Sequence, residues 1–336
     1  MKKRSLLLAP FALAALAACA PMPASQAPAS GAAARTFDLQ GHRGARGLAP
    51  ENTMVAFERA LRIGVNTLEL DVGVAADQQL VVAHDPYLNP VFTRDLVGQW
   101  LEGERGPLLK NMSTKMIQSY DVGRIKAGTP YAETFKDQQP ADRARIPRLV
   151  DVFQMVNAVA GRQVRFNIET KINPTRPDET VSPEAMVDLL IGAIHEHKVT
   201  DRVTIQSFDW RTLQLVQKRE PTIPTVYLTI QTANNDNVKD ERWTAGFKLA
   251  DHGGSVPRMV KAAGGATWSP NQGALTEALV KEAQGLGLKV IPWTVNEPAA
   301  MERLIDWGVD GIITDYPNRL REVMQRKRMP LPRPIQ

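Results

Sequence analysis

The sequence is poor in cysteine, in unbalanced charge and in long apolar runs. Cys19 is the only cysteine among 336 residues, so no disulfide can form within the chain. The formal net charge is +5, but Lys2, Lys3 and Arg4 carry three of the positive charges at the N-terminus. No stripe of basic and aromatic residues accompanies the charge, which argues against nucleic-acid binding. The basic residues 326–328 near the C-terminus are interpreted as part of a solvated tail, residues 326–336.

The bulk composition is that of a soluble globular protein. Apolar residues make up 43% of the chain and charged residues 23%, both ordinary values. The length suffices for one large domain or two smaller ones.

The N-terminus has the layout of an export signal. A positive segment precedes the apolar run 5–18, which is too short to span a membrane comfortably. The following Leu-Ala-Ala-Cys resembles a bacterial lipobox and predicts a signal peptide over residues 1–18 and lipidation of Cys19. Ala20 replaces the aspartate typical of retention at the inner membrane, which favours a periplasmic protein anchored to the outer membrane. A plain signal peptide, or a helix that is retained, is the alternative.

Residues 19–35 then form an uncharged Ala/Pro/Ser/Gly tether, so the folded domain is expected over residues 36–325. Within it, strand-like runs alternate with helical patterns. The eight runs that each precede a helix are 37–41, 66–72, 164–170, 202–208, 224–230, 266–270, 288–295 and 311–317. Such alternation predicts parallel βαβ units in an α/β fold, and eight of them predict a TIM (β/α)8 barrel. Gly64, Gly287 and Gly308 are expected to end three of the helices.

One further strand-like run, residues 80–85, follows the second strand too closely for a parallel crossover, which needs roughly a dozen residues. We therefore expect an antiparallel hairpin at the C-terminal mouth of the barrel, turning near residues 76–79. This pairing would place Asp71 opposite His84. The turn lacks the glycine that tight hairpins prefer. Residues 86–147 are expected to form an insertion that covers the mouth, since long loops in compact domains are usually functional.

Several acidic residues fall at expected strand ends, where parallel barrels carry their reactive groups. Glu69 and Asp71 are two apart on the second strand, and Asn167 and Glu169 follow the same spacing on the third. Three carboxylates in one cavity repel each other, and a hard divalent cation such as Mg²⁺ or Ca²⁺ offsets that repulsion. The alternative is that the acids are solvated or paired with Arg43 and Lys171.

Two histidines, His42 after the first strand and His84 after the hairpin, lie beside these acids. A hard cation with oxygen ligands leaves imidazoles free for proton transfer, for which their pKa is suited. The other histidines, His195, His197 and His252, are interpreted as incidental surface residues.

Two cations and one aromatic residue complete the predicted site. Arg43 and Lys171 suit binding of phosphate oxygens, and they also balance the charge of the acids. Trp293, at the end of the seventh strand, is either a core residue or a wall against the substrate's carbon skeleton. Asp315 stands at the end of the eighth strand.

The ordered set of motifs resembles the glycerophosphodiester phosphodiesterase family. The motifs are His42-Arg43-Gly44, Pro50-Glu51-Asn52-Thr53, Glu69-Leu70-Asp71-Val72, His84-Asp85, Asn167-Ile168-Glu169-Thr170-Lys171, Ser207-Phe208, Trp293-Thr294-Val295-Asn296 and Gly311-Ile312-Ile313-Thr314-Asp315. The resemblance implies a TIM barrel with an insertion and hydrolysis of glycerophosphodiesters to glycerol 3-phosphate and an alcohol. It also implies a divalent metal on Glu69, Asp71 and Glu169, an acid/base pair in His42 and His84, and phosphate contacts from Arg43 and Lys171. Arg46 departs from the family pattern, in which a small residue is usual at this position.

Two rival functions remain at this stage. A phosphodiesterase acting on lipid or lysolipid head groups would release phosphatidic or lysophosphatidic acid, and a wide apolar groove beside the mouth would favour it. A non-catalytic surface lipoprotein would use the barrel as a binding module. Besides the small-molecule substrate and the membrane, no protein partner is indicated.

Overall fold

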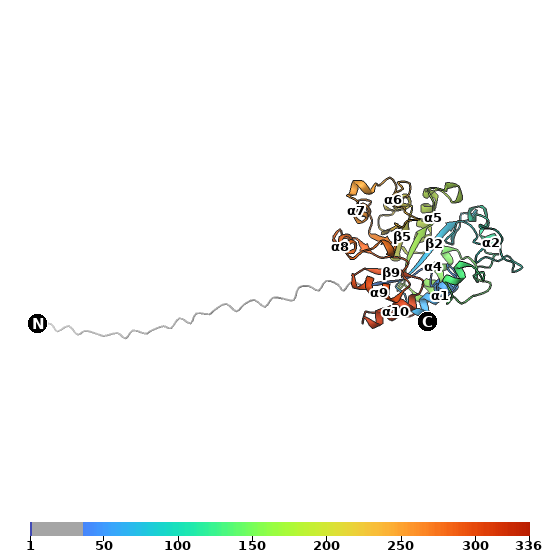
Figure 1. Ribbon diagram of the computed structural model, residues 1–336, viewed down its shortest axis with the longest axis horizontal. Helices are drawn as coiled ribbons and strands as arrows, with labels where there is room; N and C mark the ends of the chain where they lie inside the picture. Colours follow the sequence, from blue (N-terminus) through green and yellow to red (C-terminus); the bar gives the residue numbers. More distant parts are fainter. Residues whose placement is uncertain (2–35) are drawn as a thin grey trace. The chain divides into compact units, whose positions relative to one another are not determined.

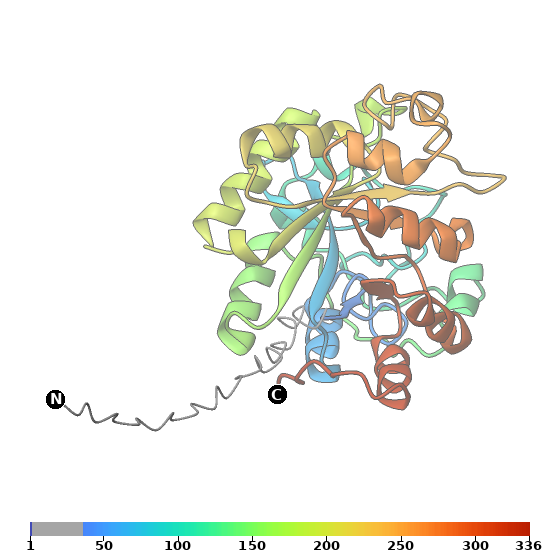
Figure 2. The ribbon, with the colours of Figure 1, turned by 90° about the vertical axis from the view of Figure 1, so that its left-hand side faces the viewer.

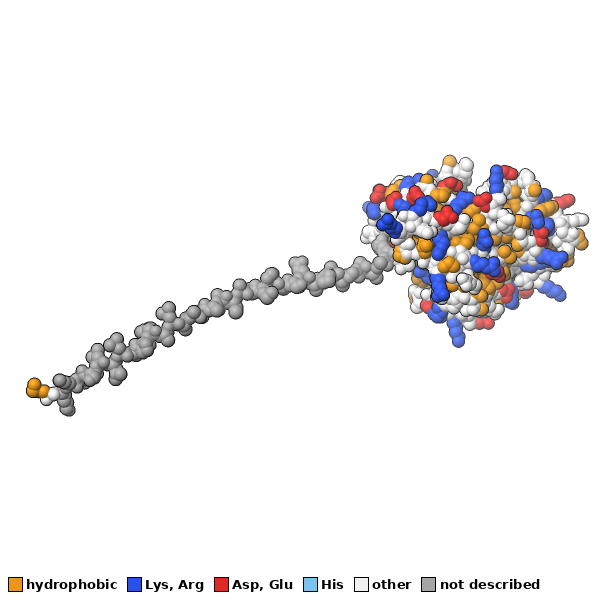
Figure 3. Space-filling view, turned by 90° about the horizontal axis from the view of Figure 1, so that it is seen from below, with side chains coloured by type: hydrophobic (Ala, Val, Ile, Leu, Met, Phe, Trp, Pro, Cys, Tyr) orange, Lys and Arg blue, Asp and Glu red, His pale blue; other side chains and the backbone are white. Residues whose placement is uncertain are grey.

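The computed structural model describes Met1 and residues 36–336, and Thr36–Gln336 form one compact unit. The predicted signal peptide, the lipidation site Cys19 and the tether lie outside the described residues. Within the described part of the chain, no helix is both long and apolar enough to cross a membrane. Figure 3 shows acidic and basic side chains interspersed over one face of the folded unit.

The central sheet consists of parallel strands in the order β8-β7-β6-β5-β4-β2-β1-β9 (Figures 1 and 2). These strands are β1 (Asp38–Gly41), β2 (Thr67–Val74), β4 (Arg165–Thr170), β5 (Val203–Ser207), β6 (Thr225–Thr229), β7 (Thr267–Pro270), β8 (Lys289–Val290) and β9 (Gly311–Thr314). The chain beyond β8 closes the sheet on β9, because the amide of Ile313 donates to the carbonyl of Pro292 at 3.0 Å and the amide of Val295 to that of Ile313 at 3.0 Å. The predicted eight-stranded α/β barrel is confirmed as a nearly closed barrel.

A helix follows every parallel strand and covers the outside of the barrel (Figure 2). The helices are α1 (Met54–Ile63), α4 (Leu149–Ala160), α5 (Pro183–Glu196), α6 (Trp210–Arg219), α7 (Val256–Ala262), α8 (Glu277–Gly285), α9 (Pro298–Asp306) and α10 (Pro317–Arg326). Thr53 caps the start of α1 by accepting from the amide of Ala56. Gly64, just after α1, has a φ of 93°, a conformation that glycine adopts without steric cost.

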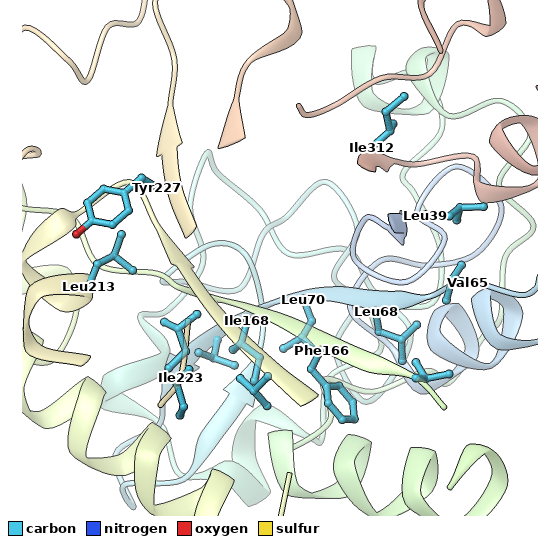
Figure 4. Close-up of a cluster of buried hydrophobic side chains, with 14 of the residues drawn as sticks. Leu39, Val65, Leu68, Leu70, Phe166, Ile168, Leu213, Ile223, Tyr227 and Ile312 are labelled. Atoms are coloured by element: carbon cyan, nitrogen blue, oxygen red, sulfur yellow. The ribbon is translucent and has the colours of Figure 1, made fainter. Parts of the chain in front are cut away.

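The alternation of side chains along β2 and β4 decides which residues reach the site. Leu68 and Leu70 on β2, with Phe166 and Ile168 on β4, are fully buried in the apolar cluster (Figure 4). The ring of Phe166 packs edge-on against Phe153 of α4, with centroids 4.9 Å apart, so this face of the strands points to the helices. The intervening residues of both strands therefore point into the barrel.

The hairpin expected after β2 is present, but its register differs by one residue from the prediction. β3 (Leu80–Val82) pairs antiparallel with β2, with Val72 opposite Val82. The amide of Ala83 donates to the carbonyl of Asp71 at 3.0 Å, so Ala83, not His84, lies opposite Asp71. The turn is centred on Asp77, because Gln78 takes the left-handed conformation, with a φ of 59°. His84 is the first residue beyond this pair.

Residues 86–147 lie on the barrel mouth side of β3 and carry three short helices, η1 (Leu109–Asn111), α2 (Thr114–Ile117) and α3 (Pro130–Thr134). Their buried side chains form an apolar cluster separate from the main core, made of Ala75, Val81, Leu88, Leu109, Met112, Ile117, Val122 and Ile146. Four further 3₁₀ turns are η2 (Pro177–Glu179), η3 (Thr200–Arg202), η4 (Leu249–His252) and η5 (Gln272–Ala274).

The C-terminal residues are not the wholly solvated tail expected from their charge. Arg326 and Lys327 form ion pairs with Glu302 and Asp306. The amide of Ile335 donates to the carbonyl of Leu61 at 2.9 Å, and the Ile335 side chain joins the main core. An apolar residue near the end of the chain therefore holds the segment beside α1 (Figure 2).

Candidate active site

Three carboxylates meet at the C-terminal ends of two adjacent strands. Glu69 and Asp71 project from β2 and Glu169 from β4, where Asp71 and Glu169 are direct neighbours across the parallel ladder. One oxygen from each lies within 4.8 Å of the others, and all three residues are buried. The structure thus brings together the acids that the sequence analysis had placed on separate strands.

The three acids differ in their affinity for protons. Burial, and then the charges of Asp71 and Glu169, raise the pKa of Glu69 well above its usual value. Burial also raises the pKa of Glu169 to about 7, although Lys171 opposes the shift. Burial acts in the same sense on Asp71, but the charges of Arg43 and Lys171 outweigh it and hold the pKa of Asp71 below its usual range.

The two predicted cations balance part of this negative charge. Arg43 donates from Nη1 to Glu51 at 2.6 Å, and its Nε lies 3.2 Å from Asp71. Lys171 Nζ lies 2.6 Å from Glu169 and 3.7 Å from Asp71. The charge-balancing role considered from the sequence is therefore present. Arg43 also lines a cavity at the mouth, so balancing the charge of the acids does not prevent it from binding phosphate.

The acids also fit a divalent cation. Asp71 Oδ1 is buried and accepts no hydrogen bond from the described residues, which leaves a carboxylate oxygen in need of a partner. The donors that converge here are carboxylate oxygens, the ligands of hard ions such as Mg²⁺ and Ca²⁺. Glu69, Asp71 and Glu169 therefore suit a hard divalent metal ion.

His42 is held in place by the carboxylate of Asp315. Its Nδ1 lies 2.7 Å from Asp315 Oδ1, and its Nε2 lies 3.9 Å from Glu69 Oε2. Arg46 donates to both oxygens of Asp315, from Nε at 2.8 Å and from Nη2 at 3.1 Å. Burial and then the charge of Arg46 lower the pKa of His42 to about 4. The imidazole is thus neutral near neutral pH.

His84 is held in a similar arrangement by Asp85. Its Nδ1 lies 3.0 Å from Asp85 Oδ1, and Asn89 donates to the other oxygen of Asp85 at 2.8 Å. Burial, and then the charges of Arg43 and Lys171, lower the pKa of His84 to about 3. Each histidine therefore has one ring nitrogen bound to a carboxylate.

Two adjoining cavities open at this site. The smaller, of about 120 Å³, is lined by both histidines, Arg43, Glu69, Glu169 and Trp293, among others. The larger, of about 250 Å³, shares His84, Glu169 and Phe208 with the first and extends to the insertion. Trp293 forms part of the wall, with its ring edge-on to Phe208 at 5.3 Å and its Nε1 donating to the carbonyl of Ser269 at 3.0 Å. Of the two interpretations of Trp293, a core residue or a wall of the substrate cavity, its position agrees with the second.

Gln206 was not singled out by the sequence analysis, and the contacts that Asn52 and Asn167 make at the site were not predicted there. Gln206 of β5 donates to Glu69 at 2.7 Å, and Asn52, from the first loop, donates to Asp71 at 2.9 Å. Asn167 lies below the acids and donates to Gln206 at 2.8 Å. Gln206 lies beside Glu169 in the parallel ladder and points, like Glu169, into the barrel. The two-residue alternation along β5 could therefore have indicated Gln206 from the sequence. Asp315 holds His42 through a contact between residues 273 positions apart, which no local sequence pattern indicates.

The remaining histidines lie away from these cavities, as expected. His195 pairs with Glu220, and His197 bonds back to its own helix at Ala193. His252 packs against Phe247. None of them lines either cavity.

The fold and site define a barrel hydrolase, and comparisons with known proteins place it in a family. Residues 42–319 match the Glycerophosphoryl diester phosphodiesterase family. A glycerophosphodiester phosphodiesterase of Caldanaerobacter subterraneus is 30% identical over 285 residues, covering 85% of this chain and 96% of that protein. One of Bacillus subtilis is 28% identical over 290 residues, covering 84% of each.

Solved structures agree in fold. A candidate glycerophosphoryl diester phosphodiesterase from Silicibacter pomeroyi superposes with a TM-score of 0.78 at 32% identity, covering 88% of this chain and 95% of that one. A phosphodiesterase of Oleispira antarctica, solved with the product sn-glycerol-3-phosphate, has a TM-score of 0.63 at 19% identity, covering 86% and 97%.

The chain belongs to the glycerophosphoryl diester phosphodiesterase family. It is a glycerophosphodiester phosphodiesterase, a phosphoric diester hydrolase whose substrates are small glycerophosphodiesters. This assignment does not support the alternative of a non-catalytic binding module.

Proposed function

We propose that the enzyme uses a divalent cation and two histidines to hydrolyse glycerophosphodiesters to glycerol 3-phosphate and an alcohol. The observation that carries the proposal is that three acids converge on one point, and that two of them, Glu69 and Glu169, line one cavity together with both histidines. Glycerol 3-phosphate is also the product bound by the Oleispira antarctica enzyme.

The chain's own residues would divide the work as follows. Glu69, Asp71 and Glu169 hold the cation, which when bound offsets negative charge that develops on the phosphoryl group. Arg43 and Lys171 bind phosphate oxygens through N–H donors. Trp293 lies against the carbon skeleton of the glycerol.

Proton transfer falls to the two histidines. One, neutral, accepts the proton of the attacking oxygen, which belongs to water or to the neighbouring glycerol hydroxyl. The other must be protonated in the complex, where the bound phosphate anion favours its imidazolium form, and it donates that proton to the leaving alcohol oxygen. Each such step is typically worth about 10²–10⁴-fold in rate. Both histidines line the same cavity, so the geometry is compatible with either order.

The test combines substitution with metal depletion. His42→Ala and His84→Ala should abolish turnover of glycerophosphocholine while the circular dichroism spectrum is unchanged, whereas His195→Ala, at an exposed position of α5, should retain full activity. A chelator should silence the wild-type enzyme, and Ca²⁺ or Mg²⁺ should restore it. Near-normal rates in either active-site variant, or in excess chelator, would contradict the assignment.

A lysolipid substrate is the second candidate, since a lysophospholipase D of Rattus norvegicus is 24% identical over 291 residues. The larger cavity combines charged side chains such as Arg105 and Lys171 with apolar and aromatic ones such as Ile172, Phe208 and Trp243, so its lining is compatible with either substrate class. Comparing a lysophospholipid with glycerophosphocholine and glycerophosphoethanolamine in the same assay decides between the two.

We also propose that Cys19 carries lipid and anchors the enzyme in the periplasm, at the outer membrane. The support is the lipobox-like sequence alone. Labelled fatty acid should enter the wild-type protein and not Cys19→Ser, and the variant should appear in the soluble periplasmic fraction. Equal labelling of both proteins would refute the anchor.

A further inference from the structure

The larger cavity contains residues that the proposed chemistry does not use. It extends from His84 to Tyr87 and Arg105 of the insertion, and to Arg176 and Glu179 in the loop that follows β4. A phosphodiester has two ester arms. With its phosphorus beside His42 and Arg43 in the smaller cavity, the arm on the side of His84 enters this space.

One end of this cavity carries two guanidinium groups beside a single carboxylate. Arg105 Nη1 lies 2.6 Å from Glu179 Oε1, and Arg176 Nη1 lies 3.3 Å from the same oxygen. Two guanidinium groups thus share one carboxylate. Since Arg keeps its charge at any accessible pH, the trio has a net charge of about +1 when Glu179 is ionised.

The other acids at this cavity already have partners. Asp85 accepts from His84 and Asn89, and Glu169 accepts from Lys171. The guanidinium carbon of Arg105 lies 5.0 Å from the centroid of the Tyr87 ring, so a protein cation occupies that aromatic face. A cationic head group would find the face of Tyr87 covered and, as its one carboxylate not paired with a protein cation, Asp85, whose oxygens already accept two hydrogen bonds.

We propose that this cavity receives the alcohol arm of the diester and selects an alcohol that carries an anionic group over one that carries a cation. The inference rests on the proposed function and names the substrate class within it. Arg105 and Arg176 are the specificity-determining residues, because their donors suit phosphate or carboxylate oxygens. Glu179 limits their attraction for an anion.

The experiment measures kcat/KM for two substrates, glycerophosphocholine and bis(glycerophospho)glycerol, whose leaving alcohol carries a second phosphate anion. The wild-type enzyme should prefer the anionic substrate, and the preference should shrink as salt is added, because the guanidinium groups are partly exposed. Arg105→Gln should lower the ratio of the two kcat/KM values, and Glu179→Gln should raise it. Each change is expected to be about 1.5- to 5-fold, the size typical of exposed charge pairs.

Opposite shifts from the two variants separate selection from structural damage, which would move both substrates together. Arg242→Gln is the matched control, because Arg242 is an exposed arginine paired with Asp240 and lines neither cavity. Turnover of both diesters without preference, a preference for the choline diester, or shifts of the same sign in both variants would overturn the inference alone. Failure to hydrolyse either diester would overturn the proposed function and this inference with it.

Discussion

Asp315 Oδ1 lies 2.7 Å from His42 Nδ1, although the two residues are 273 positions apart in the chain. Burial alone would raise the pKa of Asp315, but the charge of Arg46 and the contact with His42 hold it below its usual range. An ionised carboxylate only accepts hydrogen bonds, so Nδ1 of His42 carries the proton. The free nitrogen for proton transfer is then Nε2, which faces the acid cluster.

Asp315→Asn is therefore expected to lower kcat by about 10²-fold, the size of a general acid–base contribution, with a smaller change in KM. The amide cannot fix the same tautomer, because it presents both a donor and an acceptor. Steady-state kinetics with glycerophosphocholine measures the effect. Asp240→Asn, at an exposed ion pair, serves as the control, and a variant at position 315 with unchanged kcat would remove Asp315 from the positioning of His42.

The acid cluster predicts how the stability of the metal-free protein depends on pH. Because the pKa of Glu169 rises to about 7 on folding, and that of Glu69 also rises, the folded state binds more protons than the unfolded state between about pH 4.5 and 7. These groups therefore make the free energy of unfolding fall as pH rises through that window, by up to about 1.4 kcal/mol per pH unit for each proton. His42 and His84 act in the opposite sense below about pH 6.5, because their pKa values fall on folding to about 4 and about 3. The difference between thermal melts of the chelator-treated wild-type protein and of Glu169→Gln, from about pH 5 to 7.5, therefore isolates the contribution of Glu169.

A bound cation takes the place of these protons, so the increase in Tm on adding Ca²⁺ or Mg²⁺ should grow as pH rises over the same range. Glu169→Gln provides the control, because its amide does not titrate and the slope should decrease. A Tm that is independent of both pH and added cation would contradict the account of the acids.

The insertion is predicted to support phosphate binding through Tyr131. The hydroxyl of this residue in α3 donates to Glu51 Oε2, and Glu51 Oε1 in turn accepts from Arg43. Tyr131→Phe leaves one oxygen of a buried carboxylate without its donor, and kcat/KM should fall about tenfold, mainly through a higher KM. Tyr120→Phe, in the apolar cluster of the same insertion, should behave as wild type. An unchanged KM in Tyr131→Phe would show that Glu51 holds Arg43 without help.

The hairpin turn offers a site for stabilisation. Gln78 has a φ of 59°, a conformation that costs non-glycine residues about 1–2 kcal/mol. Gln78→Gly removes this cost, but glycine loses more backbone entropy on folding than glutamine does. The free energy of unfolding should therefore rise by only about 0.5–1 kcal/mol. Chemical denaturation measures the gain. Gln139→Gly, at an exposed loop position, should give none, and a loss of stability at position 78 would show that the side chain contributes contacts that outweigh the strain.

The sequence by itself determined the elements, the inward-facing acids and the family. Alternating strand and helix patterns predicted the barrel, and the two-residue spacing of Glu69 with Asp71 placed both on the inner face, because side-chain direction in a strand depends only on local backbone geometry. The motif order was specific enough to indicate the family.

Tertiary structure alone decided how these groups meet. The hairpin register differs by one residue from the expected pairing, and the turn holds Gln78 in the left-handed conformation, which local patterns did not reveal. The contacts of Asp315 with His42, of Arg105 with Glu179 and of Ile335 with the core join segments far apart in sequence. Such contacts arise only when the barrel closes and the insertion packs on it, so no local pattern of residues can specify them.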